Sequence, residues 1–380
     1  MRINNIYHYD SDTKIKVDNV KFNRFNVLVG ISGAGKTSII NSLIAIVQIL
    51  KGRSAVSEEW VIKFTDNLNN EVEWSGKYSN ESEIDKDGDE FAELLEEKVL
   101  LNGRVLLKKS DGNIVYDGIN LPSLDKYKSL IYLLRDDSKI TEIHKAIGSI
   151  IIVDSNSRLY AEPNATPILN SALNKKIKKE NSSEKALINK LSAMHNEMNC
   201  RERIYYACIY DKQKFSDFEF CFSNIFPEVK LITPKVVTAV VDPENGVEKK
   251  LILINLELEN GTIVKQFHIS SGMFKSMMIL SELFFGNSDS PIIIDEVENS
   301  LGINCLPDIL NELKISDNQV IITTHHPRII NNVEPNSWKI ISRNGSNIIA
   351  NEAEQFINST SHHDKFIQLI NSAIYRGKSI

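Results

Sequence analysis

The chain has 380 residues, of which 42% are hydrophobic and 25% charged, and its formal net charge is −6. This composition predicts a globular protein with a large core, and the negative balance gives no indication of a general attraction to nucleic acid. The four cysteines lack the CxxC spacing of zinc and redox sites, and no stretch is long and apolar enough to span a membrane. We therefore predict a cytoplasmic protein without a membrane anchor.

A glycine-rich loop at residues 30–37 follows the apolar run 25–29 and precedes an apolar helical stretch at 38–50. The loop fits the pattern G-x-x-x-x-G-K-[ST] at every fixed position. Its glycines let backbone N–H groups approach phosphate oxygens, Lys36 adds a positive charge, and the Thr37 hydroxyl suits Mg²⁺. We therefore predict binding of ATP and Mg²⁺. The predicted nucleotide-binding residues are Gly30, Ser32, Gly33, Ala34, Gly35, Lys36, Thr37 and Ser38.

Residues 59–118 alternate between apolar and polar side chains, and the dipeptides Asn102-Gly103 and Asp111-Gly112 separate apolar runs. Such dipeptides favour tight hairpin turns, so we predict an antiparallel β subdomain beside the nucleotide-binding lobe. Residues 123–147 have a helical pattern, and 150–153 form a predicted strand that returns to the core sheet.

Residues 168–210 are polar and place apolar side chains at helical intervals. The pattern is too short for a long coiled coil and predicts a short helical hairpin. Its apolar positions are Leu173, Ile177, Leu187, Leu191 and Met194. An insertion here also accounts for the long separation between Lys36 and the acidic motif downstream.

That acidic motif is Asp295-Glu296, which follows the buried strand predicted at 291–294. Acids at the carboxyl end of a parallel strand lie beside the phosphate loop. We predict that Asp295 holds Mg²⁺ and that Glu296 activates the attacking water. A similar run ends at Asp154, but Ser155 follows it where a hydrolytic carboxylate is expected, so we favour Asp295.

Two further motifs flank this strand. Upstream, residues 269–275 place hydroxyl and glycine donors at the start of an apolar helix, and such a terminus suits anions. Downstream, residues 319–323 form a predicted buried strand that leads to His325 and His326. The sequence leaves open which histidine faces a phosphate, although His325 lies nearer the end of the strand.

The order of these motifs resembles the ABC-type ATPase heads of the SMC-like and OLD-family ATPases, over residues 1–50 and 260–345. The resemblance implies that Ser271 and Gly272 are signature residues, which cap the ATP held by a second subunit. It also implies that residues 298–301 form the D-loop.

By the same resemblance, His325 is the switch histidine that contacts the γ-phosphate, and the catalytic group comprises Lys36, Glu296 and His325. The chain departs from the family pattern at Ser32, where many relatives have Asn, and at His326, where Ser is usual. Its signature is Ser-Ser-Gly-Met rather than the transporter form, and no Q-loop glutamine is evident.

OLD-family nucleases carry a metal-dependent TOPRIM domain after the ATPase, and too few residues follow His326 for such a domain. The resemblance therefore implies an ATP-hydrolysing enzyme that forms a head-to-tail dimer around ATP. It further implies control of a separately encoded effector, a nuclease or toxin, as in anti-phage systems of the PARIS, Septu and retron types. The alternative is a RecF-like or SMC-like repair ATPase that binds DNA directly.

We thus predict an α/β fold of the P-loop NTPase, ABC-ATPase type, with a mostly parallel sheet, an antiparallel β subdomain and an inserted helical hairpin. The expected ranges are 1–167 for an N-terminal ATPase lobe, 168–210 for the helical insertion and 211–380 for a C-terminal ATPase lobe.

Overall fold

The computed structural model describes residues 1–84, 86, 90–153, 198–242, 247–302, 304–355, 357, 362–373 and 375. These residues form two compact units. Unit 1 comprises residues 1–152, 289–297 and 318–380, and unit 2 comprises 153–288 and 298–317. The three ranges proposed from the sequence stay a prediction.

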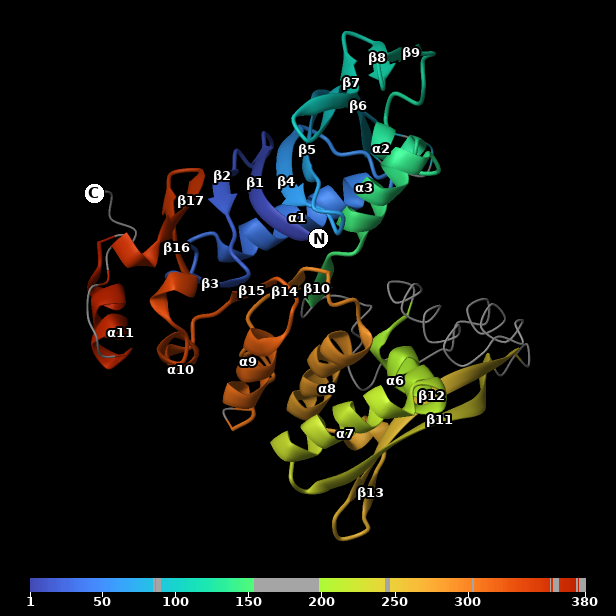
Figure 1. Ribbon diagram of the computed structural model, residues 1–380, viewed down its shortest axis with the longest axis vertical. Helices are drawn as coiled ribbons and strands as arrows, with labels where there is room; N and C mark the ends of the chain where they lie inside the picture. Colours follow the sequence, from blue (N-terminus) through green and yellow to red (C-terminus); the bar gives the residue numbers. More distant parts are fainter. Residues whose placement is uncertain are drawn as a thin grey trace. The chain divides into compact units, whose positions relative to one another are not determined.

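Unit 1 contains the phosphate loop, the Asp-Glu motif and both histidines. The helices and strands of the chain are labelled in Figure 1. Its strands are β1 (Arg2–Asp10), β2 (Lys16–Lys21), β3 (Phe25–Val29), β4 (Glu58–Thr65), β5 (Glu71–Ile84), β6 (Glu90–Leu101), β7 (Arg104–Ser110), β8 (Asn113–Tyr116), β9 (Ile119–Leu121), β10 (Ile151–Val153, at the boundary with unit 2), β14 (Ile292–Ile294), β15 (Val320–Thr323), β16 (Trp338–Asn344) and β17 (Asn347–Glu352). Its helices are α1 (Lys36–Leu50), α2 (Leu130–Leu133), α3 (Ser138–Gly148), α10 (Pro327–Asn331) and α11 (His362–Asn371), with 3₁₀ turns η4 (Pro335–Ser337) and η5 (Ala353–Gln355).

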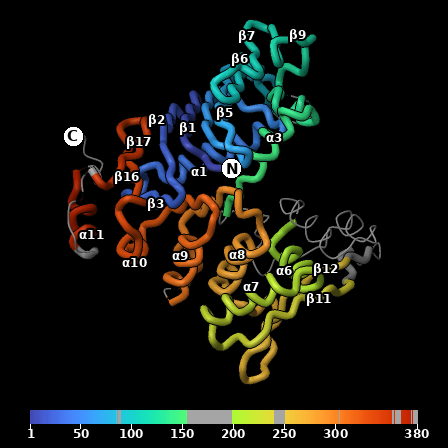
Figure 2. The backbone as a smooth tube through the Cα atoms, in the orientation of Figure 1, coloured from blue at the N-terminus to red at the C-terminus, as the bar shows by residue number. Residues whose placement is uncertain are grey.

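All these strands belong to one 14-stranded sheet in the order β10-β14-β15-β3-β16-β17-β2-β1-β4-β5-β6-β7-β8-β9. Strand β3 pairs in parallel with β15 and with β16, and β15 pairs in parallel with β14. From β2 through β9 the pairings are antiparallel. Figure 2 shows the blue β3 beside the red β16, although the two are far apart in the sequence. The α/β fold is confirmed, with a mixed sheet that is parallel where the phosphate loop begins.

The antiparallel region is continuous with the core sheet, because β4 pairs with β1. Both predicted hairpin turns are present: Asn102-Gly103 joins β6 to β7 and Asp111-Gly112 joins β7 to β8, each with two positive φ angles. A third turn of this kind, Asp117-Gly118, joins β8 to β9 and carried the same sequence signal.

The core of unit 1 lies between the sheet and helices α1 and α3, which share one cluster of buried apolar side chains. In the antiparallel region Trp60, Trp74 and Tyr78 pack together, with ring centroids 5.4 and 5.7 Å from that of Trp60. The helix predicted at 123–147 is in fact two helices: α2 ends at Leu133, and Asp137 caps the start of α3 by accepting from the Lys139 N–H.

Unit 2 pairs a helical layer with a small sheet. Its elements are α6 (Cys200–Tyr210), α7 (Lys212–Ile225), β11 (Val229–Asp242), β12 (Val247–Leu258), β13 (Ile263–Val264), the 3₁₀ turn η3 (Gln266–His268), α8 (Ser271–Phe285) and α9 (Leu306–Ile315). Strands β11, β12 and β13 form an antiparallel sheet. A capping box between Asn199 and Glu202 starts α6, and the buried ion pair between Arg203 and Glu282 joins α6 to α8.

The end of the predicted helical insertion is helical, since α6 covers Cys200–Tyr210. Its five apolar positions between Leu173 and Met194 lie outside the described residues. Among the residues that the structure describes, no helix is both long and apolar enough to cross a membrane.

Candidate functional site

The phosphate loop connects the buried strand β3 to helix α1 through backbone that requires glycine. A Cβ atom on Gly30 would lie 2.6 Å from the Ile341 carbonyl oxygen. Gly33 and Gly35 have φ angles of +80° and +102°, and a Cβ on Gly35 would also lie 2.6 Å from the side chain of Ile348. The loop therefore packs closely against the β16–β17 hairpin, and a larger residue in place of Gly30 or Gly35 would displace the loop.

Helix α1 begins at Lys36 with Gly35 as its N-cap, and this cap offers no side-chain acceptor to the first helical N–H groups. Such a terminus presents its N–H groups to an anion. Lys36 is buried, and its Nζ donates to the carbonyl oxygens of Gly30 at 2.8 Å and Ile31 at 3.1 Å. The Lys36 ammonium group thus lies inside the loop that is predicted to bind phosphate. The side chains of Ser32 and Thr37 are exposed.

The parallel pairing brings the predicted acids to the same edge of the sheet as the loop. Ile294 pairs with Ile322, and Thr323 pairs with Leu28 of β3. Continuing this register, Asp295 lies beside Thr323 at the carboxyl ends of β14 and β15, and the loop leaves β3 at the same end. This is where ligands bind in parallel α/β sheets.

Thr323 joins the two acids directly. Its hydroxyl donates to Asp295 Oδ1 at 2.5 Å and accepts from the backbone N–H of Glu296 at 2.7 Å. Glu296 has a φ angle of +42°, a left-handed conformation that is costly for a residue with a long side chain. Thr323 was not predicted as a site residue, because a threonine inside a buried apolar strand gives no distinctive signal in the sequence.

The two adjacent histidines have different surroundings. His325 Nε2 lies 3.4 Å from Glu296 Oε1, with both side chains partly exposed. His326 is the N-cap of α10, and its Nδ1 accepts from the Arg328 N–H at 3.2 Å. The structure therefore pairs His325 with the predicted catalytic acid. The dipeptide His326-Pro327 carried a usable signal, since proline favours the first position of a helix and makes the preceding residue its cap.

The predicted signature residues lie in unit 2, at the start of α8. Ser270 caps this helix by accepting from the Met273 N–H at 3.2 Å, and Ser271 is exposed. A Cβ on Gly272 would lie 2.8 Å from the Ser300 carbonyl oxygen. The start of α8 is thus packed against the predicted D-loop, residues 298–301.

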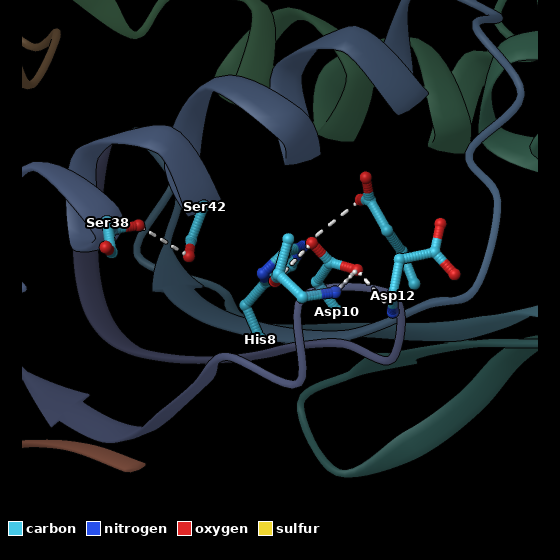
Figure 3. Close-up of polar contacts among 7 residues, drawn as sticks. His8, Asp10, Asp12, Ser38 and Ser42 are labelled. Carbon is cyan, nitrogen blue, oxygen red and sulfur yellow. Dashed lines mark hydrogen bonds and ion pairs between the residues drawn. The ribbon is translucent and has the colours of Figure 1, made fainter. Parts of the chain in front are cut away.

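A separate set of polar contacts holds the scaffold near the ends of β1 and α1 (Figure 3). His8 Nε2 lies 3.1 Å from Glu58 Oε2 and joins β1 to β4. The Asp10 carboxylate accepts from the backbone of the following turn, and the Ser42 hydroxyl donates to the Ser38 carbonyl within α1. Ser38 enters this set only through its carbonyl oxygen.

Comparison with known proteins gives a family. A sequence profile described as "AAA domain, putative AbiEii toxin, Type IV TA system" matches residues 25–331. A search of curated protein sequences found no significant match.

Solved structures similar to this chain include three SMC heads. An Smc head bound to the C-winged helix domain of ScpA covers 93% of this chain and 99% of its own, with 15% identity and a TM-score of 0.48. A Pyrococcus furiosus Smc head with an extended coiled coil, bound to the C-terminal domain of ScpA, covers 93% and 97%, with 13% identity and a TM-score of 0.46. The Thermotoga maritima SMC head covers 93% and 99%, with 13% identity and a TM-score of 0.42.

TM-scores below 0.5 do not establish a family, so the family of this chain is assigned from the sequence profile alone. The profile match spans most of the chain, from β3 through the phosphate loop and the Asp-Glu motif to α10. The chain therefore belongs to this family of AAA-type P-loop ATPases.

Proposed function

We propose that the protein hydrolyses ATP with Mg²⁺ at the edge of the unit 1 sheet. The observation that carries this proposal is the 3.4 Å approach of His325 Nε2 to Glu296 Oε1, at the strand edge from which the phosphate loop also leaves. A carboxylate and an imidazole beside a phosphate-binding loop can orient water and contact the terminal phosphate.

The residues of the site fit these ligands. Lys36 and the first N–H groups of α1 would bind the phosphates, because the ammonium group already lies inside the loop. Thr37 and Asp295 would hold Mg²⁺, since a hydroxyl and a carboxylate are the hard oxygen ligands that it prefers. Bound there, Mg²⁺ would neutralise phosphate charge. Glu296 would take a proton from the attacking water, and His325 would orient the terminal phosphate.

The test is Glu296→Gln, which keeps the size of the side chain and removes the proton acceptor. We expect ATP binding to persist and turnover to fall by at least about 100-fold. Glu142→Gln on the exposed face of α3 is the matched control and should leave turnover unchanged. Unchanged hydrolysis in Glu296→Gln would refute the assignment.

We further propose that two subunits bind head to tail around two ATP molecules. The support is the exposed side chain of Ser271 at the start of α8, beside the predicted D-loop. The Glu296→Gln variant should increase in mass from one to two subunits when ATP is added. Adding Ser271→Arg should abolish this increase, whereas Thr262→Arg, at an exposed site in unit 2, should preserve it.

The proposal extends to control of a separate effector, a nuclease or toxin, in bacterial anti-phage defence. Its support is the family description, which names a toxin–antitoxin system, and the size of the β4–β9 region, which exceeds what phosphate binding requires. The test is co-purification of the chain with the products of its neighbouring genes. Nucleic-acid cleavage or toxicity by this chain alone, or tight DNA binding without a partner, would favour the alternatives, including a RecF-like or SMC-like repair ATPase.

A further inference from the structure

Thr323 is fully buried at the end of β15, and its hydroxyl group contacts both the Asp295 carboxylate and the backbone N–H of Glu296. A hydroxyl has one hydrogen and two lone pairs. The Glu296 backbone N–H can only donate, so it must point at a lone pair of the Thr323 oxygen. The hydroxyl hydrogen is then available to Asp295 Oδ1, and at 2.5 Å this is a short, charge-assisted hydrogen bond.

This bond fixes how the Asp295 carboxylate is turned. Because Oδ1 accepts from Thr323, this hydrogen bond restrains the rotation of the Asp295 carboxylate. Groups that hydrogen-bond a metal ligand from behind orient it and tune its affinity for the metal. Thr323 is such a group, because its hydroxyl donates to Asp295, the predicted Mg²⁺ ligand.

The same hydroxyl supports the backbone of Glu296, whose φ angle is +42°. The Thr323 carbonyl oxygen also accepts from the Val297 N–H at 3.1 Å. The main-chain segment that turns left-handed is thus held on both sides by one residue of the neighbouring strand. An unfavourable backbone conformation persists where its surroundings enforce it.

We propose that Thr323 is a positioning residue that couples the metal ligand Asp295 to the water-activating Glu296. The inference rests on the proposed ATPase function and deepens it. If the hydroxyl is lost, Asp295 loses its fixed orientation and Glu296 loses the support of its strained backbone, so metal binding and turnover fail together.

The test compares Thr323→Val, which keeps the shape and removes the hydroxyl, with Thr323→Ser, which keeps the hydroxyl. Calorimetry with a non-hydrolysable ATP analogue, with and without Mg²⁺, measures how strongly the metal promotes binding. We expect Thr323→Val to reduce this promotion and kcat by about 10- to 100-fold, with KM for ATP changing less. Thr323→Ser should restore both quantities to within a few-fold of wild type.

A second readout does not depend on activity. Hydrogen exchange at the Glu296 and Val297 amides should be faster in Thr323→Val than in wild type, because one acceptor is lost and the strained segment is released. Thr323→Ala provides the same comparison if the valine variant does not fold. Thr324→Val is the matched control: Thr324 is equally buried, and its hydroxyl accepts from the His326 N–H at 2.9 Å instead. It should leave the exchange of Glu296 and the Mg²⁺ effect unchanged.

The outcomes separate the two proposals. If the wild-type protein binds the analogue equally well without Mg²⁺ and hydrolyses no ATP, the proposed function fails and this inference fails with it. If the wild-type protein shows both properties and Thr323→Val retains them with slow exchange at Glu296, only the positioning role is overturned.

Discussion

The imidazole of His325 lies 3.4 Å from the Glu296 carboxylate, measured from Nε2 to Oε1, while the next side chain along the chain turns away to cap a helix. We predict that His325→Ala lowers kcat for ATP hydrolysis by at least about 100-fold, since it removes a group placed to contact the phosphate. His326→Ala is the control, because it removes a helix cap and should cost about 1 kcal/mol of stability with little loss of turnover. Equal losses of activity in the two variants would contradict this division of roles.

Glycines 33 and 35 provide a matched pair inside the phosphate loop. Both have positive φ angles, but a Cβ would meet no atom within 4 Å at Gly33, whereas at Gly35 it would overlap Ile348. Gly33→Ala should therefore cost only backbone strain, about 1 kcal/mol, and Gly35→Ala should cost about 1 to 3 kcal/mol more. Thermal unfolding measures the difference. Because Ile348 is itself buried, the steric part is measured by a double-mutant cycle, in which Gly35→Ala should cost less in an Ile348→Ala background than in wild type. Equal destabilisation of the two single variants would argue against the contact.

A buried glutamine ties β1 to the base of the core sheet. The Gln319 side chain accepts from the Ile3 N–H at 2.7 Å and donates to the carbonyl oxygens of Ile3 and Asn23, each at 2.8 Å. Gln319→Leu leaves the buried N–H and C=O of Ile3 and the partly buried C=O of Asn23 without this partner, so we expect a loss of about 3 kcal/mol in the free energy of unfolding. Gln213→Leu, at an exposed position of α7, should change it by less than about 0.5 kcal/mol.

Tryptophan fluorescence measures the loss of unit 1 stability in Gln319→Leu. All three tryptophans of the chain, Trp60, Trp74 and Trp338, are buried and lie in unit 1. A fluorescence-monitored transition that Gln319→Leu leaves unshifted would show that the amide contributes no net stability.

Glu97 gives unit 1 a pH dependence with a defined sign. Burial raises the pKa of its carboxyl group, and hydrogen bonds from Ser129, Leu130 and Trp74 only partly oppose this effect. The folded state therefore holds a proton more tightly than the unfolded state, whose pKa is about 4.5. The stabilisation is complete below the unfolded pKa and is lost as the pH rises through the raised folded pKa.

Glu97→Gln removes this titration, and so the comparison with wild type isolates it. We expect the stability advantage of wild type over Glu97→Gln to be largest in acid and to shrink as the pH increases. Urea unfolding of both proteins at several pH values measures this difference in the free energy of unfolding. An advantage that grows with pH would mean that the folded pKa is lowered instead.

The parts of the site that follow one another in the chain could be predicted from the sequence. The strand, loop and helix around Lys36 are contiguous, and their spacing alone indicates the chemistry. The roles of Thr323 and His326 depend on the groups that they contact in the folded protein, Asp295 and Glu296 for Thr323 and the Arg328 N–H for His326. Residue type alone did not distinguish His326 from His325. His326 could have been assigned from the proline that follows it, but Thr323 required the pairing of β15 with β14.

The fold shows the same limit. Alternation and Asn-Gly or Asp-Gly dipeptides predicted the hairpins of the antiparallel region, because these features are local. The continuity of that region with the core sheet was not evident, since it depends on β1 pairing with both β2 and β4. Pairing across such distances leaves no local pattern in the sequence.

The position of β3 in the sheet has a consequence for how the protein is made. Its two neighbours, β15 and β16, lie near the other end of the chain, at Val320–Thr323 and Trp338–Asn344. A ribosome therefore synthesises the phosphate loop early and the strands that flank it late. Contacts of such high sequence separation form slowly and leave strand edges exposed in the meantime. The nascent chain thus carries the phosphate loop before the parallel strands on either side of β3 exist, and ATP can act as a folding ligand only after β15 and β16 have been synthesised.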